Sequence, residues 1–219
     1  MCDAGLPRHL NPADDRPHTP TDEPWWGEWW RFDFAGGDGG LAGLVRICLL
    51  HNQRTVWYWA SLVGPGRLPV VVHDDEVALP RPGSLEIRAE GLWADHIIEV
   101  PLEQVTVGCE AFALRLDDPV DIADDPVLGE RIPFGLDLEW ETVKDTAVGR
   151  AAIDSAVERA FEWEGVNPGE AAYQLACDVH GDVLVADDRI HIETGGRRWH
   201  GWGMVRGTSK PQWRAERGP

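Results

Sequence analysis

The stretch IPFGLDLEWET, residues 132–142, reveals the fold class most directly, because its apolar and acidic residues alternate. In an extended strand, Leu136, Leu138 and Trp140 point to one face, and the acidic residues between them point to the other. Those acidic residues are Asp137, Glu139 and Glu141. This pattern predicts a sheet with one face against a core and the other against water.

Segments of the same kind follow one another on both sides of this stretch, with Gly, Pro, Asn and Asp residues between them. No helical pattern interrupts them between residues 25 and 140. The expected strands are WWRFDF (29–34), LAGLVRICLL (41–50), TVWYWASLV (55–63), LPVVVH (68–73), SLEIRAE (84–90), LWADHIIEV (92–100) and EQVTVGCEAFALRLD (103–117). Closely spaced strands predict an all-β fold, either an antiparallel barrel or a strongly bent sandwich.

The remaining segments divide the 219 residues further. Residues 1–22 are rich in Pro and Asp and predict a disordered tail before a β domain at 23–142. An Ala- and Glu-rich run predicts a short helix at about 149–163, within an insertion at 143–172. Strands are expected again at 173–205, where they either complete the barrel or start a second half, and residues 206–219 form a second tail.

Composition excludes several classes of protein. The chain carries 38 acidic and 20 basic residues, a formal charge of -18, so it would repel nucleic acid and anionic membranes. No apolar run reaches the roughly 20 residues that span a bilayer. No secretory signal is recognisable, which predicts a cytoplasmic protein. Twelve tryptophans suit a thick apolar interior or an aromatic pocket.

Motifs for nucleotide, zinc and serine-hydrolase chemistry are absent, so no cofactor and no metal is expected. The sequence GGRRWHGWGM (195–204) is instead a candidate functional segment, because it combines arginine, tryptophan and histidine side chains between glycines. On a strand, Arg198, His200 and Trp202 project together. His200 is either a proton donor and acceptor toward an apolar ligand or a hydrogen-bonded core histidine.

His96 is the second candidate catalytic residue. It lies in LWADHIIEV among apolar neighbours, and it is either an acid/base partner of the acidic stripe at 137–141 or a satisfied core histidine. A metal site built from His180, His200 and a carboxylate on adjacent strands was a weaker alternative.

Ligand-binding residues are expected to line a hollow inside the sheet. The candidates are Trp57, Trp59, Trp93, Trp140, Arg198 and Trp202. The stretch PWWGEWW (24–30) would close one end of the barrel as an aromatic plug.

The segments PWWGEWWRFDF, GSLEIRAEGLWADH and CDVHGDVLVADDRIHIETGGRRWHGWG carry a family resemblance. They look like a large group of actinobacterial proteins, which are similar in turn to the lipocalin-like superfamily of hydroxyneurosporene synthase (carotenoid hydratase) and the AttH proteins. The most specific element is matched by Gly195, Arg198, His200, Trp202 and Gly203. Trp199 stands where the family has an acidic residue before the histidine.

This resemblance implies a lipocalin-like barrel that binds a small apolar molecule of the terpenoid, polyene or lipid class. It also implies cofactor-free hydration, isomerisation or cyclisation, with a non-catalytic carrier and a degenerate paralogue as alternatives. Relatives of this kind typically continue with further strands into a second half, so the resemblance implies that this half is truncated here, completed by another subunit, or dispensable. The last strands of this chain are therefore expected to pair onto the first sheet or across a homodimer interface, because exposed edges invite association.

Overall fold

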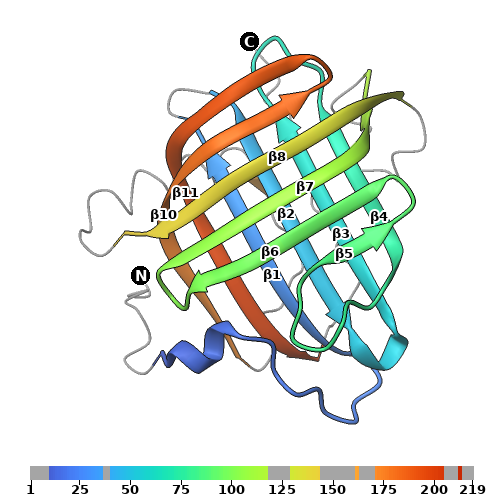
Figure 1. The fold of residues 1–219 in the computed structure, drawn as a ribbon, viewed down its shortest axis with the longest axis vertical. Coiled ribbons are helices and arrows are strands. Elements are labelled where there is room, and N and C mark those ends of the chain that lie inside the picture. The colour runs from blue at the N-terminus through green and yellow to red at the C-terminus, as the bar shows by residue number, and fades with distance from the viewer. Residues whose placement is uncertain are drawn as a thin grey trace.

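The computed structural model describes residues 10–36, 40–117, 129–143, 161–162, 171–204 and 212–213. Within them the chain is almost entirely β-structure, with a ten-stranded antiparallel sheet that curves round on itself (Figure 1). The predicted all-β, lipocalin-like architecture is confirmed. The expected helix at 149–163 falls largely outside the described residues. Two residues of that expected helix, Phe161–Glu162, form a short strand instead.

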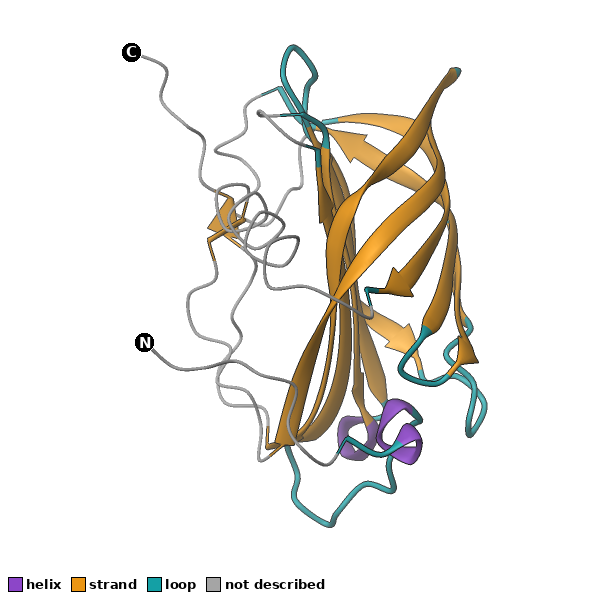
Figure 2. Cartoon of the chain, turned by 90° about the vertical axis from the view of Figure 1, so that its left-hand side faces the viewer, coloured by secondary structure: helices purple, strands orange, loops and turns teal. Residues whose placement is uncertain are grey.

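The sheet strands are β1 (Trp26–Ala35), β2 (Ala42–Leu50), β3 (Thr55–Val63), β4 (Val70–Ala78), β5 (Ile87–Ala89), β6 (Leu92–Val100), β7 (Gln104–Arg115), β8 (Glu130–Thr142), β10 (Ala171–Val185) and β11 (Asp188–Met204). Two short strands, β9 (Phe161–Glu162) and β12 (Gln212–Trp213), pair separately. The 3-10 turns η1 (Pro12–Asp15) and η3 (His51–Gln53) lie at the same end of the sheet (Figure 2).

The strand order is β4-β3-β2-β1-β11-β10-β8-β7-β6-β5, and β4 also pairs with β7. The β4–β7 pairing joins Val70 to Arg115 and Val71 to Leu114, which closes eight strands into a ring at the end where β4 begins. Toward the other end the hairpin of β5 and β6 continues the sheet beyond β7. Closure covers the strand edges of β4 and β7 only at these two residue pairs, so β5 and the rest of β4 remain edges of the sheet.

The last strands complete this ring within one chain. The last ten residues of β11 pair with the whole of β1, from Trp26 opposite Met204 to Ala35 opposite Gly195. β10 pairs with β8 on its other side. β11 runs without interruption from Asp188 to Met204. Glycine allows this continuity, because a Cβ on Gly196 would lie 2.3 Å from the Asp33 carbonyl oxygen.

The core lies inside the ring. Alternate residues of the strands form one large apolar cluster that includes Phe32, Tyr58 and Trp140, and the Trp140 indole N–H donates to the Asp33 carbonyl oxygen at 3.3 Å. The intervening residues of β1, β2 and β3 form two smaller clusters, which contain Trp59 and Trp57. Every residue of β1 and β2 is buried, including the charged residues Arg31, Asp33 and Arg46, and Asp33 forms ion pairs with Arg31 and Arg197.

Residues 10–22, expected as part of a disordered tail, instead lie along one end of the barrel and include η1. The Asn11 side chain accepts a hydrogen bond from the Ala13 N–H, and the Asp14 side chain accepts one from the Asn11 N–H, an N-terminal capping box. Composition alone predicted disorder, but Asp15 is buried and so anchors the segment. We call residues 10–24 the N-terminal segment.

Candidate functional site

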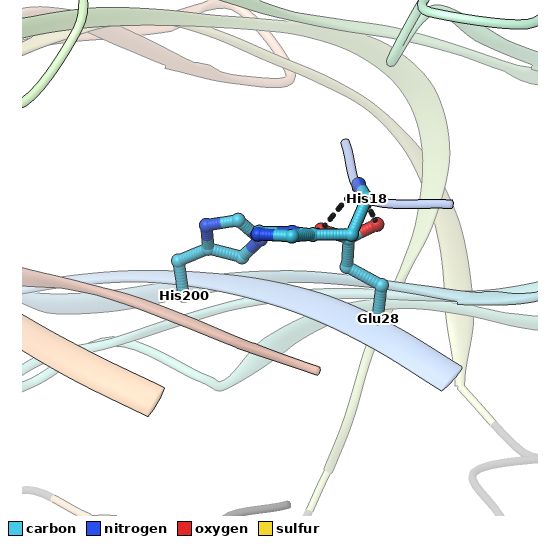
Figure 3. Close-up of side chains that lie close together, drawn as sticks. All are labelled: His18, Glu28 and His200. Atoms are coloured by element: carbon cyan, nitrogen blue, oxygen red, sulfur yellow. Dashed lines mark hydrogen bonds and ion pairs between the residues drawn. The ribbon is translucent and has the colours of Figure 1, made fainter. Parts of the chain in front are cut away.

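Three ionisable side chains from distant parts of the chain meet at the end of the barrel that the N-terminal segment crosses (Figure 3). His18 comes from that segment, Glu28 from the start of β1, and His200 from β11. Trp30 stands opposite His200 in the β1–β11 ladder, and Glu28 precedes it by two residues. The period of two along a strand therefore puts Glu28 and His200 on the same face. We call these three residues the His–Glu–His centre.

One carboxylate oxygen lies between the two imidazoles. Glu28 Oε1 is 2.7 Å from His18 Nδ1 and 2.8 Å from His200 Nε2. The backbone N–H of His18 also donates to Glu28 Oε2 at 2.9 Å. Both oxygens of Glu28 are thus engaged, as a buried carboxyl group requires.

Aromatic rings surround this polar group. The Trp30 indole stacks on the His200 imidazole with ring centroids 4.4 Å apart, and the Trp202 indole stacks on the His18 ring at 3.8 Å. Tyr173 meets His200 edge-on at 5.5 Å. The Glu28 side chain is 0% exposed and that of His18 is 23% exposed, so His18 is the member nearest to solvent.

Burial shifts the titration of all three groups toward their neutral forms. It raises the pKa of Glu28 to about 8, although the hydrogen bond from the His18 backbone acts in the opposite direction. Burial also lowers the pKa of His18. The pKa of His200 lies well below its usual value, first because of burial and then because of the neighbouring His18. Perturbed groups of this kind gather at functional sites more often than elsewhere.

A second buried polar group holds the N-terminal segment in place. The Arg198 guanidinium donates to both carboxylate oxygens of Asp15, at 3.0 and 3.2 Å. The Tyr173 hydroxyl and the Leu102 backbone N–H also donate to Asp15. Because Asp15 is only three residues from His18, these contacts fix the position from which His18 reaches Glu28.

The structure brings together three of the residues singled out in the sequence. His200 belongs to the centre, Trp202 stacks on His18, and Arg198 binds Asp15 beside it.

His96 lies elsewhere, inside the core. Its ring is near Phe32 and Tyr58, and its Nδ1 is 3.4 Å from the Leu85 carbonyl oxygen. Burial lowers the pKa of His96 to about 4. Asp137 and Glu141 are exposed on the opposite face of β8 from the buried Leu138 and Trp140. The expected acid/base pairing of His96 with this acidic stripe is therefore wrong, because the sheet separates them.

The predicted ligand-binding indoles do not line one shared hollow. Trp140 is buried in the main core, whereas Trp57 and Trp59 belong to the two smaller clusters on the other face of β3. Trp93 is partly exposed and donates to Glu86 at 3.1 Å. The alternation of residues along β3 puts Trp57 and Trp59 on the face opposite Tyr58.

The alternative metal site with His180 is wrong. His180 stands opposite Glu193 in the β10–β11 ladder, whereas Tyr173 stands opposite His200. Seven residues of strand, roughly 23 Å, therefore separate the two histidines along the sheet. His180 instead lies 3.5 Å from Glu139 on an exposed face.

Two members of the centre, His18 and Glu28, were missed by sequence reasoning. Glu28 carried a usable signal, because it is the one acidic residue among four tryptophans in PWWGEWW. An acid on such an aromatic strand is expected to need a buried partner. His18 carried none, since its segment is polar and rich in proline.

An apolar cavity lies at the other end of the barrel, where β4 and β7 pair. Its volume is about 230 Å³. Leu41, Leu62, Val70 and Val185 line it, and these side chains belong to or pack against the main core. Arg67 and Arg115 stand at the same cavity, each paired with an acidic residue.

Fold and site together define a lipocalin-like β-barrel with a buried polar centre at one end and an apolar cavity at the other. The chain belongs to the family described as Domain of unknown function (DUF7064), which matches residues 11–215. No curated protein matches the sequence. Among the described residues, none of the helices could cross a lipid bilayer.

Similar folds occur among solved structures. A crystal structure of CghA matches with a TM-score of 0.40 and 12% identity, covering 89% of this chain and 53% of that chain. A crystal structure of CghA with Sch210972 matches with the same TM-score and identity, at 88% and 52% coverage. The chain thus spans about half the length of the CghA chains it matches.

Proposed function

We propose that this protein binds a small apolar molecule, of the terpenoid, polyene or lipid class, in the cavity at the mouth of the barrel. The observation that carries the proposal is the cavity of about 230 Å³ between Leu41, Leu62, Val70 and Val185. Ligand sites are concave and mostly apolar with a few polar groups, and barrel mouths are among their usual places.

The size and walls of the cavity support a compact hydrocarbon ligand or one end of a longer one. Its aliphatic walls continue into the core, so a bound chain would be removed from water on several sides. The two arginines beside it offer hydrogen-bond donors to a polar end group. The class of ligand is the one that the sequence resemblance implies.

The proposal favours binding over catalysis. Leu41, which lines the cavity, directly precedes β2, and Gly36 directly follows the last residue of β1. Glu28 lies at the opposite end of β1, near its start. A ligand in this cavity would therefore be roughly 20 Å from the His–Glu–His centre. A carrier role needs no contact with that centre, whereas hydration, isomerisation or cyclisation by His200 would need the ligand to reach it.

Binding can be tested with the neutral fluorescent probe N-phenyl-1-naphthylamine and the full chain. Val185→Trp should fill the cavity and weaken probe binding roughly tenfold or more, because the lost burial is worth at least 1.4 kcal/mol. Leu184→Trp is the matched control, since Leu184 is the preceding residue, is exposed, and lines a separate open hollow of about 760 Å³ and not this cavity. The control should bind the probe within about twofold of the wild type.

Native mass spectrometry of gently purified protein would add the identity of a bound compound. Probe binding that Val185→Trp leaves unchanged would refute the cavity as the site. Conversion of a bound compound that is lost in His200→Gln, with probe binding retained, would favour the enzyme over the carrier.

A further inference from the structure

We propose that His18, Glu28 and His200 form a binding site for a divalent first-row transition-metal ion of the Zn²⁺ and Co²⁺ class. This inference goes beyond the proposed ligand binding and does not depend on it, because the apolar cavity lies at the other end of the barrel. It rests on the identity, convergence and burial of the three side chains.

The donor set is one that such ions prefer. His18 offers Nδ1, His200 offers Nε2 and Glu28 offers a carboxylate oxygen, all within 4.8 Å of one another. Two imidazoles and one carboxylate are a common protein ligand set for zinc and for non-haem iron, with a further position left open. Among the described residues, no other group of three metal-binding side chains converges in this way.

The three ligand atoms must shift to hold an ion, because the nitrogens of His18 and His200 lie within 4.8 Å of each other and would have to approach the spacing of a metal site. Zinc bonds of about 2.0–2.2 Å in a tetrahedral arrangement put two ligand atoms about 3.3 Å apart. The Glu28 oxygen lies 2.7 and 2.8 Å from the two nitrogens, so it must withdraw by roughly half an ångström. His18 belongs to no strand and is partly exposed, so it can move with the carboxylate.

The surroundings already position the ligands as an outer shell would. Stacking on Trp30 fixes the plane of the His200 ring, and stacking on Trp202 fixes that of His18. His200 Nδ1 is buried and has no hydrogen-bond partner among the described residues. A proton on Nδ1 would leave the Nε2 lone pair, which points at Glu28, free for an ion.

Bound metal would also join three separate parts of the chain. One ion would link the N-terminal segment to β1 and β11, in addition to the contacts that Asp15 makes. Metal binding should therefore increase thermal stability, because the ion binds only the folded arrangement.

The surface provides matched controls for adventitious binding. His180 lies beside Glu139, and His191 lies beside Asp182, in exposed pairs of one histidine and one carboxylate. These pairs offer the same ligand types as the His–Glu–His centre, but only two donors each. Removing either histidine should leave binding at the centre unchanged.

The test uses the full chain after treatment with a chelator. Titration calorimetry with Zn²⁺ should show one ion per chain, and Co²⁺ should give the visible absorption of a low-symmetry site. His18→Ala should weaken Zn²⁺ binding by roughly 100-fold or more, since loss of an outer-shell partner alone costs 10–100-fold. Glu28→Gln should have a similar effect, whereas His180→Ala and His191→Ala should bind as the wild type does.

Absence of Zn²⁺ and Co²⁺ binding by the wild type would overturn the proposal. Binding that persists in His18→Ala but disappears in His180→Ala or His191→Ala would do the same. His18→Ala keeps the test decisive if Glu28→Gln fails to fold, because His18 lies outside the barrel strands. A melting temperature that rises with Zn²⁺ in the wild type, but not in His18→Ala, is the second measurement.

Discussion

The imidazole of His200 stacks on the indole of Trp30, directly opposite it on the neighbouring strand, with ring centroids 4.4 Å apart. This contact sets the orientation in which Nε2 of His200 meets Glu28 at 2.8 Å. The aromatic strand β1 thus does more than close the end of the barrel, because it supplies both the carboxyl group of the centre and the ring that orients its histidine.

Replacement of Asp15 should destabilise the protein and release the N-terminal segment. Asp15→Ala leaves the buried Arg198 guanidinium without its carboxylate, and breaking a buried ion pair in this way costs about 3 kcal/mol or more. Urea unfolding should give this loss in the free energy of unfolding. Hydrogen exchange of residues 10–24 should become faster at the same time.

Asp22→Ala is the control for this change, because Asp22 is exposed in the same segment. It should alter stability by no more than about 0.5 kcal/mol. Equal stability of Asp15→Ala and Asp22→Ala would show that Asp15 does not anchor the segment.

Substitution of glycine by alanine should change the free energy of unfolding very differently at two positions of the sheet. A Cβ on Gly196 would lie 2.3 Å from the Asp33 carbonyl oxygen and 2.6 Å from the Val179 side chain. Gly196→Ala should therefore lower the free energy of unfolding by about 1–3 kcal/mol through overpacking. Thermal and urea unfolding would measure the loss.

Gly108→Ala provides the comparison, since its Cβ would make an ordinary contact of 3.5 Å with the Trp93 ring. This substitution should be neutral or slightly stabilising, because alanine restricts the unfolded chain. A Gly196→Ala protein as stable as Gly108→Ala would contradict the close β1–β11 packing.

His96 should make the fold sensitive to acid. Burial holds its pKa at about 4 in the folded protein, against 6.5 for an ordinary histidine. The unfolded chain therefore binds the extra proton first, and stability should fall as the pH drops from 6.5 to 4, by about 3 kcal/mol in total. Above pH 6.5 His96 should have no effect on the pH dependence.

Among the described residues, the Tyr58 and Phe32 rings and the Leu85 carbonyl contact His96, and none of these groups is a carboxylate that could compensate a charge on its ring. Urea unfolding between pH 4 and 7 should show a shallower dependence for His96→Phe than for the wild type. His191→Phe, at an exposed position, should keep the wild-type slope. Identical slopes for all three proteins would contradict the neutral, buried state of His96.

The fold could be predicted from the sequence, because the alternation of apolar and polar residues that marks a strand lies within that strand and needs no long-range contact. The alternation of Leu136, Leu138 and Trp140 with acidic residues placed β8 correctly, with its apolar side inward. The same argument placed Arg198, His200 and Trp202 together on one face. Turn residues between strands then predicted either an antiparallel barrel or a strongly bent sandwich.

The centre could not be predicted in the same way, because its members meet through long-range contacts. His18 lies ten residues from Glu28 and Glu28 lies 172 residues from His200. Their approach depends on β11 pairing with β1 and on Asp15 holding the N-terminal segment against the barrel. The polar composition of that segment predicted disorder, since it contains no apolar pattern that would report burial of a single aspartate.

The position of a bound metal ion tests the central claim most directly. Anomalous scattering at the zinc edge, from crystals of the full chain soaked in Zn²⁺, should show a peak about 2.0–2.2 Å from His18 Nδ1, His200 Nε2 and a Glu28 carboxylate oxygen. Peaks found only beside surface histidines such as His180 and His191, with Glu28 still hydrogen-bonded to both imidazoles, would contradict a metal site at the centre.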